Sequence, residues 1–175
     1  MRIRSMWQLA RLAALLGASA LAAQATALPG GANSVQETFE SWTVSCVQTG
    51  DAKRCALSQQ QTDQQSRQRV LAIELNAGAP DKVEGALVLP FGLALDRGVT
   101  LQVDDGQAGP PLRFRTCLPV GCVVPLSFDA KLLAALRKGA ALKVNAVADG
   151  GKDTPFTISL KGFPAALDRT AALAK

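Results

Sequence analysis

The chain has 175 residues, with 19 Lys and Arg against 14 Asp and Glu, and it contains neither His nor Tyr. The absence of His excludes Ser-His-Asp and Cys-His catalysis and removes the commonest protein ligand of metal ions. No Gly-x-Gly-x-x-Gly or Walker pattern occurs, so the usual nucleotide-binding motifs are missing as well.

The first 27 residues have the pattern of a secretory signal peptide. Basic residues accompany a short apolar run over 12–23, and Ala25 and Ala27 are the small residues that signal peptidase requires. An anchor helix or a buried helix is the alternative, but the run is shorter than the ~20 residues that span a bilayer. We therefore predict a signal peptide over 1–27, a periplasmic protein (or a surface or secreted one), and no transmembrane segment after signal removal.

The rest of the chain is nearly neutral, because the signal carries three basic residues and no acid. Such a balance does not indicate nucleic acid as a partner. Residues 28–36 are rich in Gly, Asn and Ser, which predicts a flexible N-terminal arm. Residues 37–175 have a common domain size and are predicted to form a single domain.

Alternation of apolar and polar residues predicts most of this domain to be strand. In the first strand Trp42, Val44 and Cys46 share one face, and Trp42 is expected in the core. About eight strands of this kind, separated by turn signals, favour an all-β fold, either a β-sandwich or an open barrel. The predicted strands are 38–47, 53–60, 69–76, 83–89, 99–103, 112–117, 142–147 and 156–160.

One short helix is predicted over 127–139. Ser127 or Asp129 can cap its N-terminus, apolar residues recur at helical spacing, and Gly139 can end it. Residues 163–173 are expected as a short terminal helix or a frayed tail.

Four cysteines follow the signal, and export makes disulfides the expected state. Three connectivities are possible. We favour Cys46–Cys55 and Cys117–Cys122, because each pair closes a short loop between expected strand ends. The alternative is a four-thiolate zinc site, which usually shows two Cys-x-x-Cys pairs that this chain lacks.

Carboxylates are the catalytic groups that remain. Asp104 and Asp105 precede Gly106, and Asp149 and Asp153 flank a Gly pair, so all four are interpreted as turn residues. A calcium loop would need more oxygen ligands at regular spacing. A carboxylate-only hydrolase acting on an envelope glycan stays open as an alternative if two acids lie about 5–10 Å apart in a cleft.

The basic residues suggest one candidate binding face. Arg113 and Arg115 are expected on one strand face, with Lys143 on a neighbouring strand; the alternative is an ordinary solvated surface. Because Phe is scarce and Tyr absent, the aromatic platforms that bind single-stranded nucleic acid are not expected.

An ordered set of short motifs resembles the invasion-associated locus B family of exported bacterial proteins. The resemblance covers about Phe39 to Leu167 and implies a periplasmic or surface β-sandwich; it supplies no catalytic residues. The motifs are Trp42-Thr-Val-Ser-Cys46, Cys55, Leu89-Pro90-x-Gly92, Gly98-Val-Thr-Leu101, Cys117-Leu-Pro-Val-Gly-Cys122 and Ile158-Ser-Leu-Lys-Gly-Phe163.

These observations together favour an exported, non-catalytic interaction protein of the bacterial envelope, with no cofactor and no metal. Its expected partner is another envelope protein or a surface component. A surface or secreted factor in host-cell attachment or invasion is an alternative function.

Overall fold

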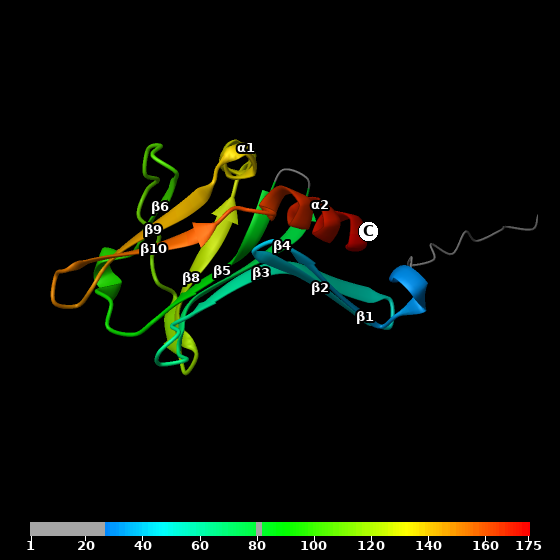
Figure 1. Ribbon diagram of the computed structural model, residues 1–175, viewed down its shortest axis with the longest axis horizontal. Helices are drawn as coiled ribbons and strands as arrows, with labels where there is room; N and C mark the ends of the chain where they lie inside the picture. The colour runs from blue at the N-terminus through cyan, green and yellow to red at the C-terminus, as the bar shows by residue number, and fades with distance from the viewer. Residues whose placement is uncertain (1–26, 80–81) are drawn as a thin grey trace, which may run out of the picture.

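The computed structural model describes residues 27–79 and 82–175, in which ten strands form two antiparallel sheets (Figure 1). The large sheet has the order β1-β2-β3-β4-β5-β8-β7 and the small sheet the order β10-β9-β6. This confirms the predicted mostly β fold and fits a β-sandwich. The strands are β1 (Ser34–Phe39), β2 (Trp42–Thr49), β3 (Ala52–Thr62), β4 (Arg69–Ala79), β5 (Lys82–Leu89), β6 (Thr100–Val103), β7 (Thr116–Leu118), β8 (Gly121–Phe128), β9 (Ala141–Val147) and β10 (Asp153–Ser159).

Two helices cover the inner face of the large sheet. Helix α1 (Ala130–Lys138) forms where the sequence predicts it, and Asp129 is the cap: its Oδ1 accepts a hydrogen bond from the Leu132 N–H at 2.8 Å. Helix α2 (Phe163–Leu173) is a packed helix, not a frayed tail, and it contacts β1 to β4. Within the described residues, neither helix has the length and apolar character needed to cross a bilayer.

The N-terminal part is more ordered than expected. The strand predicted over 38–47 is in fact two strands, because the chain reverses at Glu40 and Ser41 and Phe39 pairs with Trp42. No Gly, Pro or Asn marks this turn in the sequence. Strand β1 also includes the last residues of the segment 28–36, for which the sequence predicts a flexible arm. Leu28 at its start is only 2% exposed and packs in the core.

The prediction is least accurate around the second cysteine pair. Of the strand expected over 112–117, only Thr116 and Cys117 lie in β7, and Leu112 forms an isolated bridge with Val99. Strand β8 was missed because Pro125 interrupts its apolar run and its end overlaps the expected start of the helix. The predicted signal peptide over 1–27 lies outside the described residues, except for Ala27.

Both predicted disulfides are present, and each joins residues directly opposite on two antiparallel strands. Cys46 pairs with Cys55 across β2 and β3, and Cys117 pairs with Cys122 across β7 and β8. Each of the four sulfur atoms is therefore part of one of two separate disulfides, so none is a free thiolate for the four-thiolate zinc alternative. Each bond fixes the register of a hairpin near its turn.

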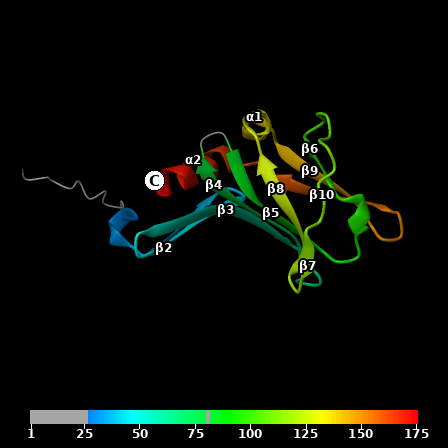
Figure 2. The same cartoon turned by 180° about the vertical axis from the view of Figure 1, so that it is seen from behind.

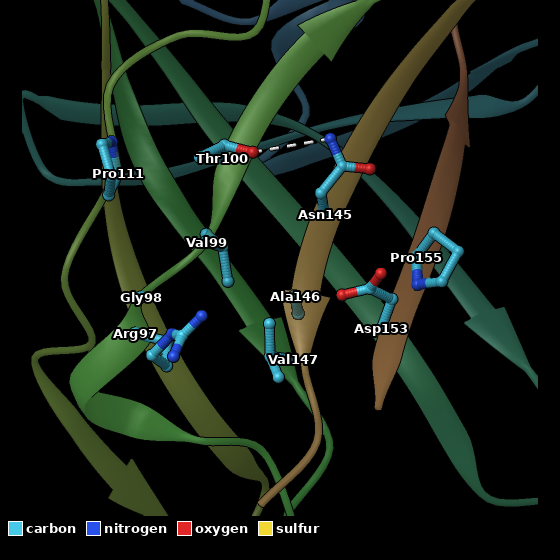
Figure 3. Close-up of a pocket in the computed structure, with 10 residues that line it drawn as sticks. All are labelled: Arg97, Gly98, Val99, Thr100, Pro111, Asn145, Ala146, Val147, Asp153 and Pro155. Carbon is cyan, nitrogen blue, oxygen red and sulfur yellow. Dashed lines mark hydrogen bonds between the residues drawn. The ribbon is translucent and has the colours of Figure 1, made fainter. Parts of the chain in front are cut away.

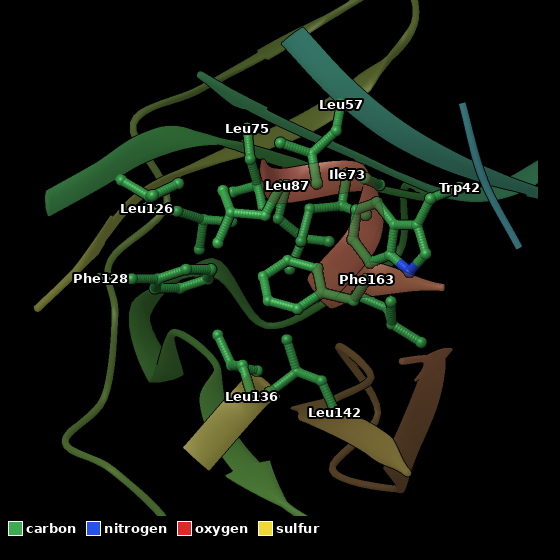
Figure 4. Close-up of a cluster of buried hydrophobic side chains, with 14 of the residues drawn as sticks. Trp42, Leu57, Ile73, Leu75, Leu87, Leu126, Phe128, Leu136, Leu142 and Phe163 are labelled. Carbon is green, nitrogen blue, oxygen red and sulfur yellow. The ribbon is translucent and has the colours of Figure 1, made fainter. Parts of the chain in front are cut away.

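The core lies between the large sheet and a second layer made by the helices and the small sheet (Figures 1 and 2). Figure 4 shows leucines of the large sheet facing Leu136 of α1 and Leu142 of β9, with Phe163 between the two layers. Trp42 is buried, as predicted, and its ring meets the Phe163 ring edge-on with centroids 5.1 Å apart. Phe163, the first residue of α2, thus packs the start of this helix against β2 of the large sheet.

Side-chain hydrogen bonds join the two sheets between β10 and the large sheet, where no strands pair. Gln59 of β3 donates from Nε2 to the Ser159 carbonyl at 2.9 Å and accepts from the Ser159 N–H through Oε1 at 3.2 Å. Gln61 Nε2 donates to the Thr157 carbonyl at 2.6 Å, and Trp42 Nε1 also donates to Ser159. These amides and the indole occupy the outer edge of β10.

A bidentate ion pair holds α2 to the edge strand β1. Arg169 donates from Nε and Nη2 to the two carboxylate oxygens of Glu37, at 2.7 and 2.6 Å. The hydrogen bonds from Arg169 lower the pKa of Glu37 from its ordinary value of 4.5, and the positive charge adds to this effect. The charged form of Glu37 is therefore favoured by folding, and its contribution is present above the unfolded pKa.

We expect Glu37→Gln to lower the free energy of unfolding at neutral pH and to leave it unchanged in acid. A carboxyl whose pKa is depressed by folding contributes stability that is lost as pH falls through the folded pKa, below 4.5. Urea denaturation of the wild type and the variant at several pH values measures the difference. A gap between the two proteins that does not narrow as the pH falls below 4.5 would contradict this role.

Candidate functional site

The predicted basic face is not built as expected. Lys143 lies on β9 and its Nζ donates to Asp105 at 2.8 Å, so an acid of the β6 turn already pairs with it. Arg113 and Arg115 are exposed, but they lie in the irregular connection between β6 and β7 and not on a strand. The three residues therefore do not form a face of neighbouring strands, although both arginines remain available for contact.

Two of the four acidic residues considered for catalysis, Asp104 and Asp105, have structural roles. Asp104 and Asp105 form the turn after β6, as predicted. The Asp104 carboxylate accepts hydrogen bonds from the N–H groups of Ala140 and Ala141 at 2.9–3.2 Å, and Asp105 pairs with Lys143, which lowers the pKa of Asp105. Asp149 lies in the turn before β10. These bonds give each acid of the Asp104-Asp105 pair a role in holding the turn.

A groove opens along the seam between the two sheets. Its volume is about 830 Å³, and we call it the seam groove. It lies between β6, the end of β8, the start of α1 and the connection after β6. Its lining residues are Leu101, Val103, Asp104, Gly106, Gln107, Ala108, Gly109, Pro110, Leu112, Ser127, Phe128, Asp129, Lys131, Leu132, Ala135, Lys138 and Gly139.

The seam groove exists because two strand edges meet there without pairing. Strand β7 pairs only with Gly121–Val123, so β8 from Val124 to Phe128 has no strand on that side among the described residues. Strand β6 pairs only with β9, and the connection after it touches its outer edge at single points, such as the Gly109 N–H to the Leu101 carbonyl at 2.8 Å. The space between these two strand edges extends inward to the core residues Leu101 and Phe128.

The floor of the seam groove is apolar and its rim is charged. Phe128 and Leu101 belong to the buried core, and Leu132 packs against it half-buried. Lys131 and Lys138 are both exposed and stand at the rim two helical turns apart, and neither forms an ion pair with a carboxylate in the described part of the chain. The groove thus offers an apolar surface beside two ammonium groups.

A second, smaller hollow of about 590 Å³ lies on the outer side of the small sheet. Figure 3 shows Arg97 and Asp153 on opposite sides of it, with Asn145 hydrogen-bonded to Thr100 at 3.5 Å. Asp153 is the one acid among its described lining residues. A pair of carboxylates, which glycoside hydrolysis needs, is therefore not assembled here.

Three exposed apolar side chains gather at one end of the large sheet. Phe91 is 61% exposed, Leu118 48% and Val120 56%. Phe91 follows the end of β5 by two residues, and Leu89 at that end pairs with Cys122, next to the turn that holds Val120. Arg69 Nη2 does donate to the Val120 carbonyl, at 2.7 Å. We call Phe91, Leu118, Val120 and Arg69 the hairpin-end surface.

The sequence alone predicted neither the seam groove nor the hairpin-end surface. Each is assembled from segments far apart in the chain, and its apolar residues look like ordinary strand or helix positions. The single available signal was Leu118-Pro-Val120 between two cysteines, where apolar residues occupy a short turn that a disulfide closes.

The chain matches the family model described as Invasion associated locus B (IalB) protein over residues 42–171. It is 51% identical over 158 residues to an Invasion protein B homologue of Brucella abortus (strain 2308), covering 90% of this chain and 91% of that protein. It is 37% identical over 152 residues to Invasion protein B of Bartonella bacilliformis, covering 85% and 81%.

A solved structure shows the same fold. The crystal structure of invasion associated protein B from Bartonella henselae superimposes with a TM-score of 0.74 at 34% identity, covering 79% of this chain and 96% of that one. The family model and these relatives span most of the described residues, including both disulfides. The chain therefore belongs to the invasion associated locus B family.

Proposed function

We propose that this chain is an exported, non-catalytic interaction protein of the bacterial envelope, and that it holds a segment of another envelope protein in the seam groove. The observation that carries this proposal is the groove itself, where half-buried apolar side chains such as Leu132 and Val103 line a concave surface on a scaffold fixed by two disulfides. Concave sites with an apolar floor and a few polar groups are the usual binding sites of proteins.

Export is supported by two independent features. The pattern of residues 1–27 is that of a secretory signal. The two disulfides fit a protein that folds outside the reducing cytoplasm.

A non-catalytic role is supported by the residues present. The chain has no His or Tyr, its cysteines are bonded to one another, and its best-placed acids are committed to backbone N–H groups or to cations. In the seam groove, Asp104 binds the N–H groups after α1 and Asp129 caps that helix. Each acid there already has a structural function.

A polypeptide segment fits the mixed character of the groove. Lys131 and Lys138 suit acidic residues on the partner, and the uncovered edge of β8 beside them offers backbone groups to an extended chain. Apolar side chains of the segment would contact Leu132 and Val103, which are both half-buried. The expected partner sequence is therefore short, with apolar residues next to Asp or Glu.

The test compares two substitutions on one helix. Leu132→Glu places a charge in the groove, whereas Ala134→Glu places the same charge on the exposed side of α1, away from it. With tagged protein crosslinked in intact cells, the wild type and Ala134→Glu are expected to enrich the same envelope protein. Leu132→Glu should reduce the amount of enriched partner about tenfold. A tenfold loss of affinity corresponds to about 1.4 kcal/mol, and burying an unpaired charge in the complex costs at least that much.

Two results would reject the proposal. One is that the folded wild type enriches no envelope protein; the other is that both variants retain the partner equally. Denaturation curves of both variants show that each is folded under the conditions of the experiment.

Host-cell attachment or entry is a second candidate function, favoured by the names of the relatives, which are called invasion proteins. This function requires display on the cell surface or secretion. Protease treatment of intact cells tests it: digestion of the protein supports display, and full protection in cells that also release none into the medium rejects it.

A further inference from the structure

We propose that the hairpin-end surface docks on an anionic phospholipid bilayer. This inference goes beyond the contact in the seam groove and does not depend on it, because the two surfaces share no residue. It places one end of the large sheet against a membrane.

The hairpin-end surface is apolar and projects from the body of the protein. Figures 1 and 2 show the β7–β8 hairpin and the turn between β3 and β4 at the same lower end of the molecule. Phe91, Leu118 and Val120 are three of the five large apolar side chains most exposed among the described residues. Apolar side chains on projecting turns can enter the boundary between lipid headgroups and acyl chains.

The projecting hairpin is held in one conformation. The Cys117–Cys122 disulfide closes it, and the Arg69 guanidinium fixes its turn through the Val120 carbonyl. Gly121 has a φ of 130°, and a Cβ there would meet the Leu89 carbonyl oxygen at 2.5 Å, so the turn packs directly on the end of β5. Little conformational entropy is therefore lost when Leu118 and Val120 insert.

Basic groups surround the apolar residues. Arg69 belongs to the surface, Arg67 is exposed in the adjoining turn, and Arg115 is exposed directly before β7. The acid in that turn, Asp63, accepts hydrogen bonds from the Gln65 and Ser66 N–H groups and from the Ser66 hydroxyl. Guanidinium groups therefore outnumber carboxylates in this part of the molecule, which favours binding to a partner with a negatively charged surface.

A bilayer fits this surface better than a protein groove does. The exposed apolar side chains Leu118 and Val120 belong to a hairpin that projects at the lower end of the molecule (Figures 1 and 2), where a protein partner would have to supply a matching pocket. A fluid bilayer adapts to such a shape, and anionic headgroups supply phosphates for the arginines.

The experiment measures sedimentation of the purified full-length protein, as recovered from the envelope, with two kinds of vesicle. One contains phosphatidylglycerol and phosphatidylcholine in equal parts, and the other contains phosphatidylcholine alone. We expect binding to the anionic vesicles at low salt, and a loss of most of it at about 0.5 M salt, where surface charges are screened.

A matched pair of substitutions tests the location. Val120→Asp lies in the hairpin-end surface, whereas Val47→Asp introduces the same change at an equally exposed valine of β2. Val120→Asp is expected to reduce binding to anionic vesicles about tenfold, and Val47→Asp to leave it within twofold, because only one of them contacts lipid. The crosslinked partner of the seam groove should persist in both variants.

Three outcomes would overturn the proposal. They are absence of wild-type binding to anionic vesicles, equal binding to both vesicle types, and an equal loss in Val120→Asp and Val47→Asp. Loss of a crosslinked envelope protein in Val120→Asp, without any vesicle binding by the wild type, would assign the surface to a protein partner instead.

Discussion

Replacing Phe163 by alanine is expected to lower the free energy of unfolding by about 3–5 kcal/mol, the usual loss for a fully buried Phe. The Phe163 side chain is 0% exposed and lies between the large sheet and the second layer, against the Trp42 ring (Figure 4). Removing the ring leaves a cavity where α2 begins. Helix α2 contacts β2, β3 and β4, so loss of packing at its first residue weakens its attachment to the large sheet.

Phe91→Ala is the matched control, since it makes the same chemical change at an exposed position. Its expected effect is within about 0.5 kcal/mol. Urea denaturation followed by Trp42 fluorescence measures both variants. Equal destabilisation by the two substitutions, or a loss below about 1 kcal/mol in Phe163→Ala, would contradict the assigned role of Phe163 in the core.

Removing the first disulfide is expected to have the second largest effect. In Cys46→Ala/Cys55→Ala the unfolded chain regains the entropy that the crosslink removes, about 2–3 kcal/mol for a loop of this size. Both cysteines also belong to the buried core, so the truncation adds a loss of packing. The combined destabilisation should exceed the entropic figure alone.

Cys117→Ala/Cys122→Ala provides the comparison, because its loop is shorter and Cys117 is exposed. Its expected loss is about 2 kcal/mol. Denaturation of the two oxidised double variants beside the wild type gives the order directly. A larger loss from the second pair than from the first would show that the core contacts of Cys46 and Cys55 add nothing.

The strands could be predicted wherever one face is buried, because burial imposes alternation on the sequence. Strands β4, β5, β6 and β9 show this pattern and lie within a few residues of their expected bounds. Strand β8 was not predicted because Pro125 interrupts its apolar run. The structure tolerates this proline because β7 pairs only with Gly121–Val123, so no strand on that side needs an N–H from residue 125.

The candidate surfaces could not be predicted, because each is assembled from segments far apart in the sequence. The seam groove needs β6 and β8 to approach from different sheets, and nothing in the residues near Leu101 or Ser127 states that they do. The resemblance to the invasion associated locus B family did identify the fold, and the cysteine spacing identified both disulfides. Neither specifies what the surface contacts.

The amide of Gln59 has a consequence for the behaviour of the protein at high concentration. An unpaired strand edge is a template on which a second copy can add by backbone hydrogen bonding, and this is a common route to aggregation. At Thr157 and Ser159 that route is blocked, since glutamine side chains and an indole already occupy the outward carbonyls. Self-association by strand addition would therefore have to begin at another edge of the molecule.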